Sequence, residues 1–375
     1  MKRREFLTVT AAAGAAALTG CGQQNGAGQA PDGAPAVLRK KRTLKMVTSW
    51  PKNFPGLGMS AERVAQRIND ITDGAITVKV YAAGELVGAF EAFDAVSSGT
   101  ADLAHHADYY QQGKSKAFPF FTSVPFGLTA EELAAWIYFD GGQPLWDELY
   151  ARFNAKPLLA CATGTQMGGW YRREIKSLED FKGLKVRMPG LGGEVMRRLG
   201  AAVVALPGGD IFTALQQGAI DGAEWVGPWN DLAFGFHKVA KHYYYPGFHE
   251  PGAALALAIN LSVWNDLSDG ERKLFEDIAN RECLYSLCEY KVRNAEAQQT
   301  LLKEHGVSAK PFPDDVIREL GRVSGEVLEE IGRADDLTHR VYESFKAARA
   351  KYMTYAAISD EAFIMARRKV LGGEG

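Results

Sequence analysis

Four polar residues in the middle of the chain, Gln166, Arg187, Glu224 and Glu250, have the chemistry to bind a small anion and a cation. Arg187 lies near the carboxyl end of a short apolar strand predicted over residues 184–188. A charged residue in such a strand is costly unless it is paired, and Arg is the side chain best suited to planar, bidentate recognition of a carboxylate. Arg187 therefore indicates a carboxylate anchor in a cleft. The alternative is an Arg on an exposed strand face.

Two acidic residues and an amide lie in turn-rich segments of the kind that line a binding site. The segment 224–229, Glu-Trp-Val-Gly-Pro-Trp, places an acid that can hold a cation beside Trp225, a flat wall for a small ligand. Glu250 lies within Gly-Phe-His-Glu-Pro-Gly, and Gln166 follows a predicted strand that ends near residue 162. The alternatives are core packing for the tryptophans and ordinary surface positions for the others.

Other patterns point only weakly to catalysis. The stretch 190–193, Gly-Leu-Gly-Gly, lies between a predicted strand and a predicted helix, but Val195 replaces the third glycine of the dinucleotide-binding fingerprint. His105 and His106 are adjacent on a predicted strand, so at most one of them faces a cleft. The sequence contains neither a G-x-S-x-G elbow nor an H-E-x-x-H helix, so it gives no support to nucleophilic or zinc-dependent catalysis.

Strand and helix patterns alternate through the first two thirds of the chain. We predict strands at 43–49, 75–81, 101–106, 157–162, 184–188 and 202–206, and helices at 58–71, 89–97, 193–199 and 211–217. Such alternation predicts mostly parallel sheets that are covered by helices on both faces. These sheets bind ligands beyond the carboxyl ends of their strands, which is where Arg187 and Glu224 lie.

A local repeat relates two of these units. Residues 96–106 and 215–225 share a helix end, a glycine stop, an aspartate that starts a strand and a small residue within that strand; the glycines are Gly99 and Gly218 and the aspartates Asp102 and Asp221. The shared pattern favours two related lobes. The residues just beyond the two strand ends are then His105-His106 and Glu224-Trp225, and they would face each other across a cleft.

The last third of the chain is predicted to be helical, at 269–304, 314–331 and 336–357. The third of these helices carries one apolar stripe, formed by Leu337, Val341, Phe345 and Ala348. These helices either cover the sheets of the same chain or join a partner chain.

The first residues have the pattern of an export signal. Residues 1–21 begin with positive charge, continue with an Ala-rich apolar run and end in small residues. Arg3-Arg4 followed by Phe6-Leu7 resembles a twin-arginine signal, the alternative being an ordinary secretory signal. Leu-Thr-Gly-Cys at 18–21 resembles a lipobox, in which Cys21 would carry a lipid anchor. Residues 22–37 are rich in Gly, Gln, Ala and Pro, and with the charged run that follows they predict a flexible linker over 22–42.

Length and composition limit the possibilities further. The 375 residues suit two lobes, and 46% hydrophobic with 23% charged residues is a normal globular balance. This balance argues against a disordered chain, a collagen-like fibre and a multi-span membrane protein. The formal net charge of −2 gives no electrostatic footprint for nucleic acid.

The segment 184–250, together with Thr-Ser-Trp-Pro-Lys-Asn-Phe-Pro-Gly-Leu-Gly at 48–58, resembles the extracytoplasmic solute-binding proteins of tripartite ATP-independent periplasmic (TRAP) transporters. It is most similar to the branch that binds 2-oxo acids such as pyruvate. The resemblance implies an α/β, two-lobed periplasmic binding protein of the type II kind, with hinge strands and long C-terminal helices. It also implies a transport function and no enzymatic one: a periplasmic protein captures a 2-oxo monocarboxylate and delivers it to the TRAP membrane permease.

The same resemblance implies roles for single residues. Arg187 would hold the ligand carboxylate. Gln166, Glu224 and Glu250, with the carbonyl of Trp225, would hold a Na+ ion that bridges to the carboxylate and keto oxygens. A hard cation of this kind prefers oxygen ligands, and Ca2+ is the alternative ion.

Further contacts are expected from the other lobe. Tyr109 or Tyr110 would add a hydrogen bond to the ligand, and we also expect His105, at its strand end, among the substrate-binding residues. The long C-terminal helices resemble those that are exchanged between protomers in some family members, which implies a homodimer.

We therefore predict a signal at 1–21, a linker at 22–42, a first lobe at 43–161, a second lobe at 162–258, and a return segment with C-terminal helices at 259–375. Three other functions stay open: a Ca2+-dependent TRAP protein for lactate or another carboxylate, a twin-arginine-exported NAD(P)-dependent oxidoreductase, and a two-lobed binding protein of an ABC transporter.

Overall fold

The computed structural model describes residues 41–372. The predicted export signal at 1–21, the lipobox cysteine Cys21 and all but the end of the predicted linker at 22–42 lie outside the described residues. Within residues 41–372, no helix combines the length and the apolar character that a membrane crossing requires.

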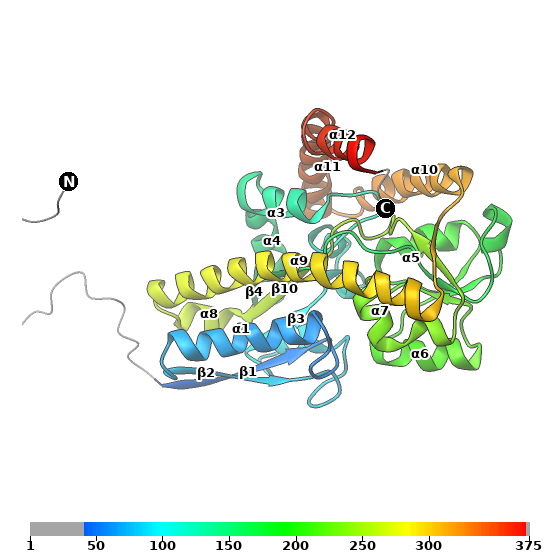
Figure 1. Ribbon diagram of the computed structural model, residues 1–375. Helices are drawn as coiled ribbons and strands as arrows, with labels where there is room; N and C mark the ends of the chain where they lie inside the picture. Colours follow the sequence, from blue (N-terminus) through cyan, green and yellow to red (C-terminus); the bar gives the residue numbers. More distant parts are fainter. Residues whose placement is uncertain (1–40, 373–375) are drawn as a thin grey trace, which may run out of the picture. The chain divides into compact units, whose positions relative to one another are not determined.

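Two mixed β-sheets form the centre of the described chain (Figure 1). Sheet A has the strand order β2-β1-β3-β10-β4, and sheet B has the order β11-β9-β5-β8-β6-β7. In chain order the strands are β1 (Arg42–Thr48), β2 (Ile76–Tyr81), β3 (Leu103–His106), β4 (Ala155–Ala162), β5 (Gly169–Tyr171), β6 (Lys185–Arg187), β7 (Ala202–Val204), β8 (Gly222–Ala223), β9 (His242–Tyr245), β10 (Ala254–Asn260) and β11 (Ala309–Pro311).

Helices connect and cover these strands. They are α1 (Leu57–Ile71), α2 (Ala92–Ser97), α3 (Ala130–Phe139), α4 (Gly142–Ala151), α5 (Gly190–Arg198), α6 (Gly208–Gln217), α7 (Pro228–Phe234), α8 (Leu261–Asp266), α9 (Asp269–His305), α10 (Asp314–Ile331), α11 (Asp336–Ala356) and α12 (Asp360–Leu371). Short 3-10 helices are η1 (Asp108–Gln111), η2 (Phe118–Phe121), η3 (Leu178–Phe181) and η4 (Phe236–Lys238). The predicted helices and strands are present, with ends shifted by a few residues. The helices α3, α4, α7, α8 and α12 and the strands β5, β9, β10 and β11 were not predicted.

The prediction of mostly parallel sheets was wrong for the strands at the crossings between the sheets. β1 pairs in parallel with β2 and β3, and β6 pairs in parallel with β7 and β8. However, β10 runs antiparallel to both β3 and β4, and β5 runs antiparallel to β8 and β9. The chain leaves sheet A after β4, returns to it at β10, and passes through α9 to reach β11. The directions of β5 and β10 depend on these crossings. A local hydrophobic pattern carries no information about such long-range connections.

The predicted repeat has a structural counterpart in each sheet. Gly99 and Gly218 follow α2 and α6 with φ angles of 78° and 71°, in the left-handed region that favours glycine. The carboxylate of Asp102 accepts the backbone N–H of Lys45 at 2.7 Å, and that of Asp221 accepts the N–H of Lys185 at 3.1 Å. Each aspartate therefore ties the start of its strand to the neighbouring parallel strand. The parallel parts of sheets A and B therefore share the same helix–glycine–aspartate–strand arrangement.

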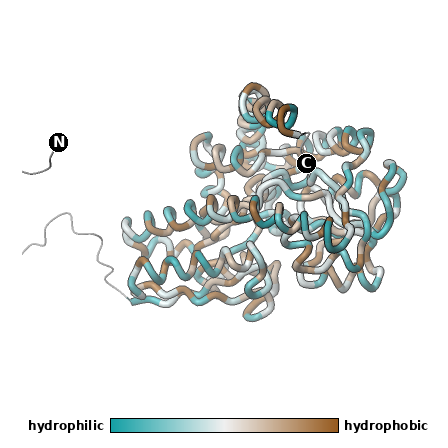
Figure 2. Tube along the Cα trace, in the orientation of Figure 1, coloured by the Kyte–Doolittle hydropathy of each residue, from teal (hydrophilic) through white to brown (hydrophobic). Residues whose placement is uncertain are grey.

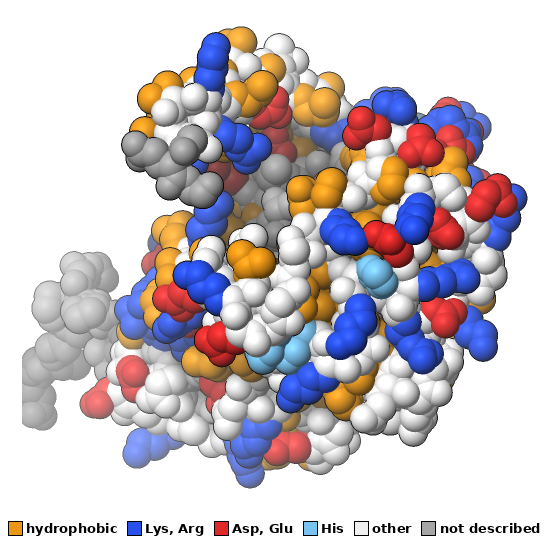
Figure 3. Space-filling model, turned by 45° about the vertical axis from the view of Figure 1, so that its right-hand side comes forward, with side chains coloured by type: hydrophobic (Ala, Val, Ile, Leu, Met, Phe, Trp, Pro, Cys, Tyr) orange, Lys and Arg blue, Asp and Glu red, His pale blue; other side chains and the backbone are white. Residues whose placement is uncertain are grey.

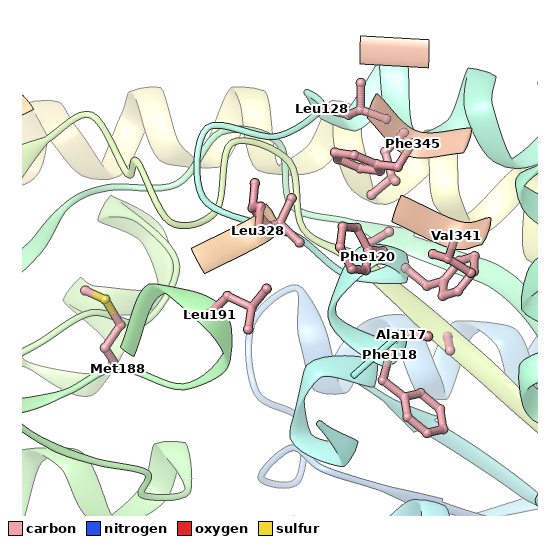
Figure 4. Packing of buried hydrophobic residues seen from close by; sticks show 14 of the residues in the cluster. Ala117, Phe118, Phe120, Leu128, Met188, Leu191, Leu328, Val341 and Phe345 are labelled. Carbon is pink, nitrogen blue, oxygen red and sulfur yellow. The ribbon is translucent and has the colours of Figure 1, made fainter. Parts of the chain in front are cut away.

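The C-terminal helices pack against the rest of the same chain. The long helix α9 contacts β4 and α1 beside sheet A and α7 beside sheet B (Figure 1). Hydrophilic and hydrophobic residues are mixed along this helix (Figure 2), but its buried residues recur at helical spacing along one face. In the core, Phe345 of α11 lies 5.4 Å from Phe120 between ring centroids, and Val341 is fully buried nearby (Figure 4). The apolar stripe of α11 thus covers its own chain.

Candidate functional site

A buried ion pair at the carboxyl ends of two parallel strands forms the centre of the candidate site. Arg187 is the last residue of β6, and Glu224 directly follows β8, which is its parallel neighbour. Both side chains are 1% exposed, and Nη1 of Arg187 pairs with Oε1 of Glu224. The strand-end rule applied to the sequence therefore located both residues.

The Arg187 guanidinium is held firmly yet keeps one open donor. Nη1 also donates to the backbone carbonyl of Glu224 at 3.0 Å, and Nε donates to the carbonyl of Leu206 at 3.1 Å. Nη2 is buried and has no hydrogen-bond partner among the described residues. Burial lowers the pKa of Arg187, but Glu224, Tyr110, Tyr109 and Glu250 together outweigh this effect, so the net pKa is raised and the group stays charged. An unpaired buried donor on a charged group is a site for an anion.

Gln166 and Glu250 come together because both lie where the chain crosses between the sheets. Gln166 lies between β4 and β5, and Glu250 lies between β9 and β10. Nε2 of Gln166 donates to Oε2 of Glu250 at 2.7 Å, and the backbone N–H of Gln166 donates to the Glu250 carbonyl at 3.1 Å. Oε1 of Gln166 is buried without a partner among the described residues. Burial, followed by repulsion from Glu224, raises the pKa of Glu250 well above its usual range.

His249 joins this cluster and was missed from the sequence. Its Nε2 lies 3.2 Å from Oε2 of Glu224, the carboxylate oxygen that Arg187 leaves free. One ligand atom each from Glu224, His249 and Glu250 lie within 4.8 Å of one another. The neighbouring position of His249 and Glu250 in the turn 247–252 was the available signal, but sequence alone could not show which member of the pair faces the site.

Aromatic side chains from both sheets enclose a small cavity beside these polar groups. Trp50 follows β1, Tyr109 and Tyr110 lie in η1 after β3, and Trp225 follows β8. The full lining consists of Trp50, Leu57, Tyr109, Tyr110, Thr163, Gln166, Trp225, Val226, Glu250, Ala253 and Leu255. The predicted residues Tyr109, Gln166, Trp225 and Glu250 therefore share one cavity. Arg187 and Glu224 are not among its lining residues in the described chain, but Cζ of Arg187 lies 5.1 Å from the ring centroid of the lining residue Trp225.

The expectation that His105 contacts the ligand does not fit its position. His105 is fully buried and is not among the residues that line this cavity in the described chain. Its Nδ1 accepts the indole N–H of Trp50 at 2.7 Å, so it lies behind one wall of the cavity. Burial lowers the pKa of His105 to about 3, which keeps the ring neutral and able to accept this hydrogen bond. His105 was predicted from its strand end, but its side chain points to the helix-covered face.

Two buried carboxylates, neither singled out from the sequence, hold the walls in place. Asp108 accepts the indole N–H of Trp146 at 2.6 Å and the hydroxyl of Tyr150 at 2.5 Å, directly before Tyr109. Asp231 accepts from Trp170 at 2.9 Å and from Tyr243 at 2.7 Å, and it also receives the backbone N–H of Val226. In each sheet, one buried Asp accepts hydrogen bonds from a Trp and a Tyr. Asp108 directly precedes Tyr109, and Asp231 accepts from Val226, so each Asp adjoins a residue that lines the cavity.

The oxygen atoms available at this site are of the kind that bind a hard cation. Two carboxylates and one free amide oxygen, from Glu224, Glu250 and Gln166, are the oxygen ligands that Na+ and Ca2+ accept. The unpaired Oε1 of Gln166 is the observation that supports this fit, because a buried acceptor without a donor is costly. When bound, a cation there would offset the charge of two neighbouring carboxylates.

Comparison with known proteins shows which family this chain matches. A model of the bacterial extracellular solute-binding proteins of family 7 matches residues 46–335. A monocarboxylate 2-oxoacid-binding periplasmic protein of Nostoc sp. is 42% identical over 361 residues, which cover 96% of this chain and 97% of the relative.

Two solved structures are also similar. A TRAP periplasmic solute-binding protein from Pseudoalteromonas atlantica, with bound sodium and pyruvate, is 34% identical with a TM-score of 0.84, covering 87% of this chain and 99% of that one. A TRAP solute-binding protein from Bordetella bronchiseptica is 32% identical with a TM-score of 0.87, covering 90% of this chain and all of that one. The latter is described as a mixed-occupancy dimer with calcium and picolinate in one site.

The Asp108 carboxyl predicts a measurable pH dependence of stability. Burial raises the pKa of Asp108 from 3.8 to about 7, because its donors only partly offset the loss of water. The folded state therefore keeps a proton that the unfolded state has released. This stabilising contribution is full below about pH 4 and is lost as the pH rises through about 7, so the free energy of unfolding falls over that window.

Denaturant unfolding of the wild type and of Asp108→Asn at several pH values checks this prediction. The variant should lose part of the decline between about pH 4 and 7, by up to about 4 kcal/mol. Asp231, whose pKa burial also raises to about 7, contributes the same slope in both proteins. Parallel curves for the two proteins would contradict the assignment.

Proposed function

We propose, because the chain belongs to the bacterial extracellular solute-binding proteins of family 7, that it captures a small 2-oxo monocarboxylate together with a cation and delivers it to a TRAP membrane permease. Such a protein works outside the cytoplasm and binds its solute without transforming it. The relatives named above support the choice of ligand, since one is a 2-oxoacid-binding protein and another holds pyruvate.

The observation that carries this proposal is a pair of buried, unpartnered atoms of opposite kind. One belongs to Gln166, which lines the cavity, and the other belongs to Arg187, whose guanidinium lies against the ring of the lining residue Trp225. Nη2 of Arg187 is an open cationic donor, and Oε1 of Gln166 is an open acceptor. A carboxylate satisfies the first, and a cation satisfies the second. A 2-oxo acid carries a carboxylate next to a keto oxygen, so one small molecule can meet Arg187 and share a cation with Gln166, Glu224 and Glu250.

The size and walls of the cavity favour a short ligand. Trp50, Tyr110 and Trp225 line a small and largely aromatic space, which suits a short ligand better than a long one. Tyr109 is the group proposed to reach the ligand from the sheet A side. We propose Na+ as the bound ion, with the Trp225 carbonyl as an additional ligand. Ca2+ is the alternative, because it too accepts two carboxylates and relatives hold either ion.

Two of the other functions are less well supported. The glycine-rich start of α5 has a packing role: a side chain on Gly192 would overlap His249 and Met188, and one on Gly193 would overlap the Met188 carbonyl. These contacts explain the glycines without a dinucleotide, so the oxidoreductase alternative loses its main support. The family also separates the chain from ABC-type binding proteins, whereas a lactate-binding member with Ca2+ stays an alternative.

The finer points of location follow from the sequence alone. We propose export through the twin-arginine route, guided by Arg3-Arg4, and a lipid anchor at Cys21. The boundary between the proposed lobes 43–161 and 162–258 falls at the end of β4, whereas the proposed end of the second lobe falls within β10 of sheet A. The proposed third segment, 259–375, holds the C-terminal helices.

We further propose a homodimer formed through the last helices. No side chain of α12 is buried, although Phe363, Ile364, Val370 and Leu371 lie at i, i+1, i+7 and i+8 and share one face. Hydrophobic side chains gather on this end of the molecule (Figure 3). A second copy that presents the same face would cover it, in line with the dimer described for the Bordetella relative.

Calorimetric titration tests the proposed ligand and ion. We expect the protein to bind pyruvate tightly with Na+ or Ca2+ present and to lose at least about tenfold in affinity when choline replaces them. Arg187→Lys keeps a charge beside Glu224 but loses the planar fork, so affinity should fall by about 30- to 1000-fold, which corresponds to about 2–4 kcal/mol. Thermal unfolding of the same variant reports whether the fold survives.

The same titrations include outcomes that refute the proposal. Equal affinity without any added cation would remove the ion from the site. Unchanged affinity in Arg187→Lys would remove Arg187 as the anchor, and failure to bind any short 2-oxo acid with either ion would overturn the proposed function.

Light scattering after size exclusion tests the dimer. The wild type should have the mass of two chains at micromolar concentration, and the double variant Phe363→Glu/Val370→Glu should have the mass of one, because two charges would enter an apolar interface. Pyruvate affinity should stay the same in both, since α12 does not reach the cavity lining. A monomeric wild type, or a variant that stays dimeric, would contradict this proposal.

A further inference from the structure

The segment 48–58 and helix α7 contain a contact that the proposed binding chemistry does not explain. Asn230 of α7 is fully buried, and its Nδ2 donates to the backbone carbonyl of Pro55 at 2.9 Å. Its Oδ1 accepts the hydroxyl of Tyr290, from α9, also at 2.9 Å. α7 lies beside sheet B, Pro55 lies between β1 and α1 beside sheet A, and α9 contacts both sides. One carboxamide therefore joins three parts of the molecule.

Aromatic packing reinforces the same junction. Phe54, next to Pro55, stacks on Phe234 at the end of α7, with ring centroids 4.3 Å apart and planes inclined by 27°. Phe54 also meets Trp225 edge-on at 6.2 Å. Phe54 is 6% exposed and Asn230 is buried, whereas Pro55 is half-buried, so the hydrogen bond is partly shielded from water. Both contacts cross from the sheet A side to the sheet B side.

The backbone at this junction allows no side chain at one position. Gly56 has a φ angle of 68°, and a Cβ there would overlap the Tyr290 hydroxyl. The Trp229 backbone N–H donates to the side chain of Asn294 at 3.0 Å, which holds α7 against α9 independently. The turn at Pro55-Gly56 in the segment 48–58 thus fits closely against the surface that α7 and α9 form together.

The residues at this junction flank the cavity but do not line it. Trp50 and Leu57, on either side of Phe54 and Pro55, line the cavity from sheet A. Trp225 and Val226, just before α7, line it from sheet B. Asn230 and Pro55 are not among the cavity-lining residues of the described chain. A contact between them fixes the two walls relative to each other.

We propose that Asn230 is an affinity-determining positioning residue, which holds the segment 48–58 against α7 and α9 and thereby keeps the two sides of the cavity together around the ligand. This inference rests on the proposed function, since it requires a ligand that leaves when the two sides separate. Separation must break the Asn230–Pro55 hydrogen bond and the Phe54–Phe234 stack. Contacts present only in the ligand-holding conformation slow ligand release and leave the chemistry at Arg187 unchanged.

The test compares release rates in three variants. Asn230→Ala removes the junction hydrogen bonds, and Phe54→Leu removes the stack while keeping most of the apolar volume. Tyr244→Phe is the matched control: it deletes a buried hydroxyl that bonds both the N–H and the carbonyl of Ile175, entirely on the sheet B side. Stopped-flow tryptophan fluorescence with pyruvate and Na+ measures both rate constants, since Trp50 and Trp225 line the cavity.

We expect Asn230→Ala to raise the dissociation rate constant about 5- to 10-fold and Phe54→Leu about 3-fold, with little change in the association rate constant. Tyr244→Phe should release pyruvate at the wild-type rate. If Asn230→Ala does not fold, Phe54→Leu decides the question by itself.

Several results would overturn the inference. Release rates equal to the wild type in both junction variants would do so, as would an equal rise in Tyr244→Phe or a loss of affinity that lies wholly in the association rate. A wild type that binds no 2-oxo acid would overturn the proposed function, and this inference with it, whereas binding with unchanged release rates overturns only the role of Asn230.

Discussion

The buried ion pair between Arg187 and Glu224 is the interaction on which the rest of the site depends. Two charges that are each 1% exposed are costly to bury unless their partners are in place, and removing one partner leaves the other uncompensated. The parallel pairing of β6 with β8 supplies this placement, because it brings the ends of both strands to one edge. Carbonyl acceptors then fix the guanidinium, and Nη2 stays open. In the proposed function, a carboxylate that reached Nη2 would meet a donor already held in place.

The second constraint is that the proposed cation ligands lie at the crossings between the sheets. Gln166 and Glu250 come from the two segments that carry the chain from sheet A to sheet B and back, and they are bonded to each other through side chain and backbone. Any rotation of one sheet against the other would change the relative positions of side chains in these segments. An ion held by Gln166, Glu250 and Glu224 would therefore link ligand binding to the relative position of the sheets.

Sequence reasoning gave the right position where position follows from local pattern. Strand ends pointed to Arg187 and Glu224, and the helix–glycine–aspartate repeat identified Asp102 and Asp221, whose carboxylates both tie neighbouring strands. It failed where long-range contacts decide. The antiparallel β10, the position of His105 behind Trp50, and the part played by His249 all depend on residues far apart in the chain. The assignment of ligand and ion came from the family resemblance, because spacing alone indicates only an anion near a cation.

A crystal structure of the protein grown with pyruvate and Ca2+ tests the central claim most directly, because anomalous scattering locates the ion independently of the ligand. The account predicts the pyruvate carboxylate within about 3 Å of Nη2 of Arg187, and the ion bound by Oε1 of Gln166 and the carboxylates of Glu224 and Glu250. A ligand whose carboxylate lies away from Arg187, or an ion that is absent from these oxygens while pyruvate is bound, would contradict it.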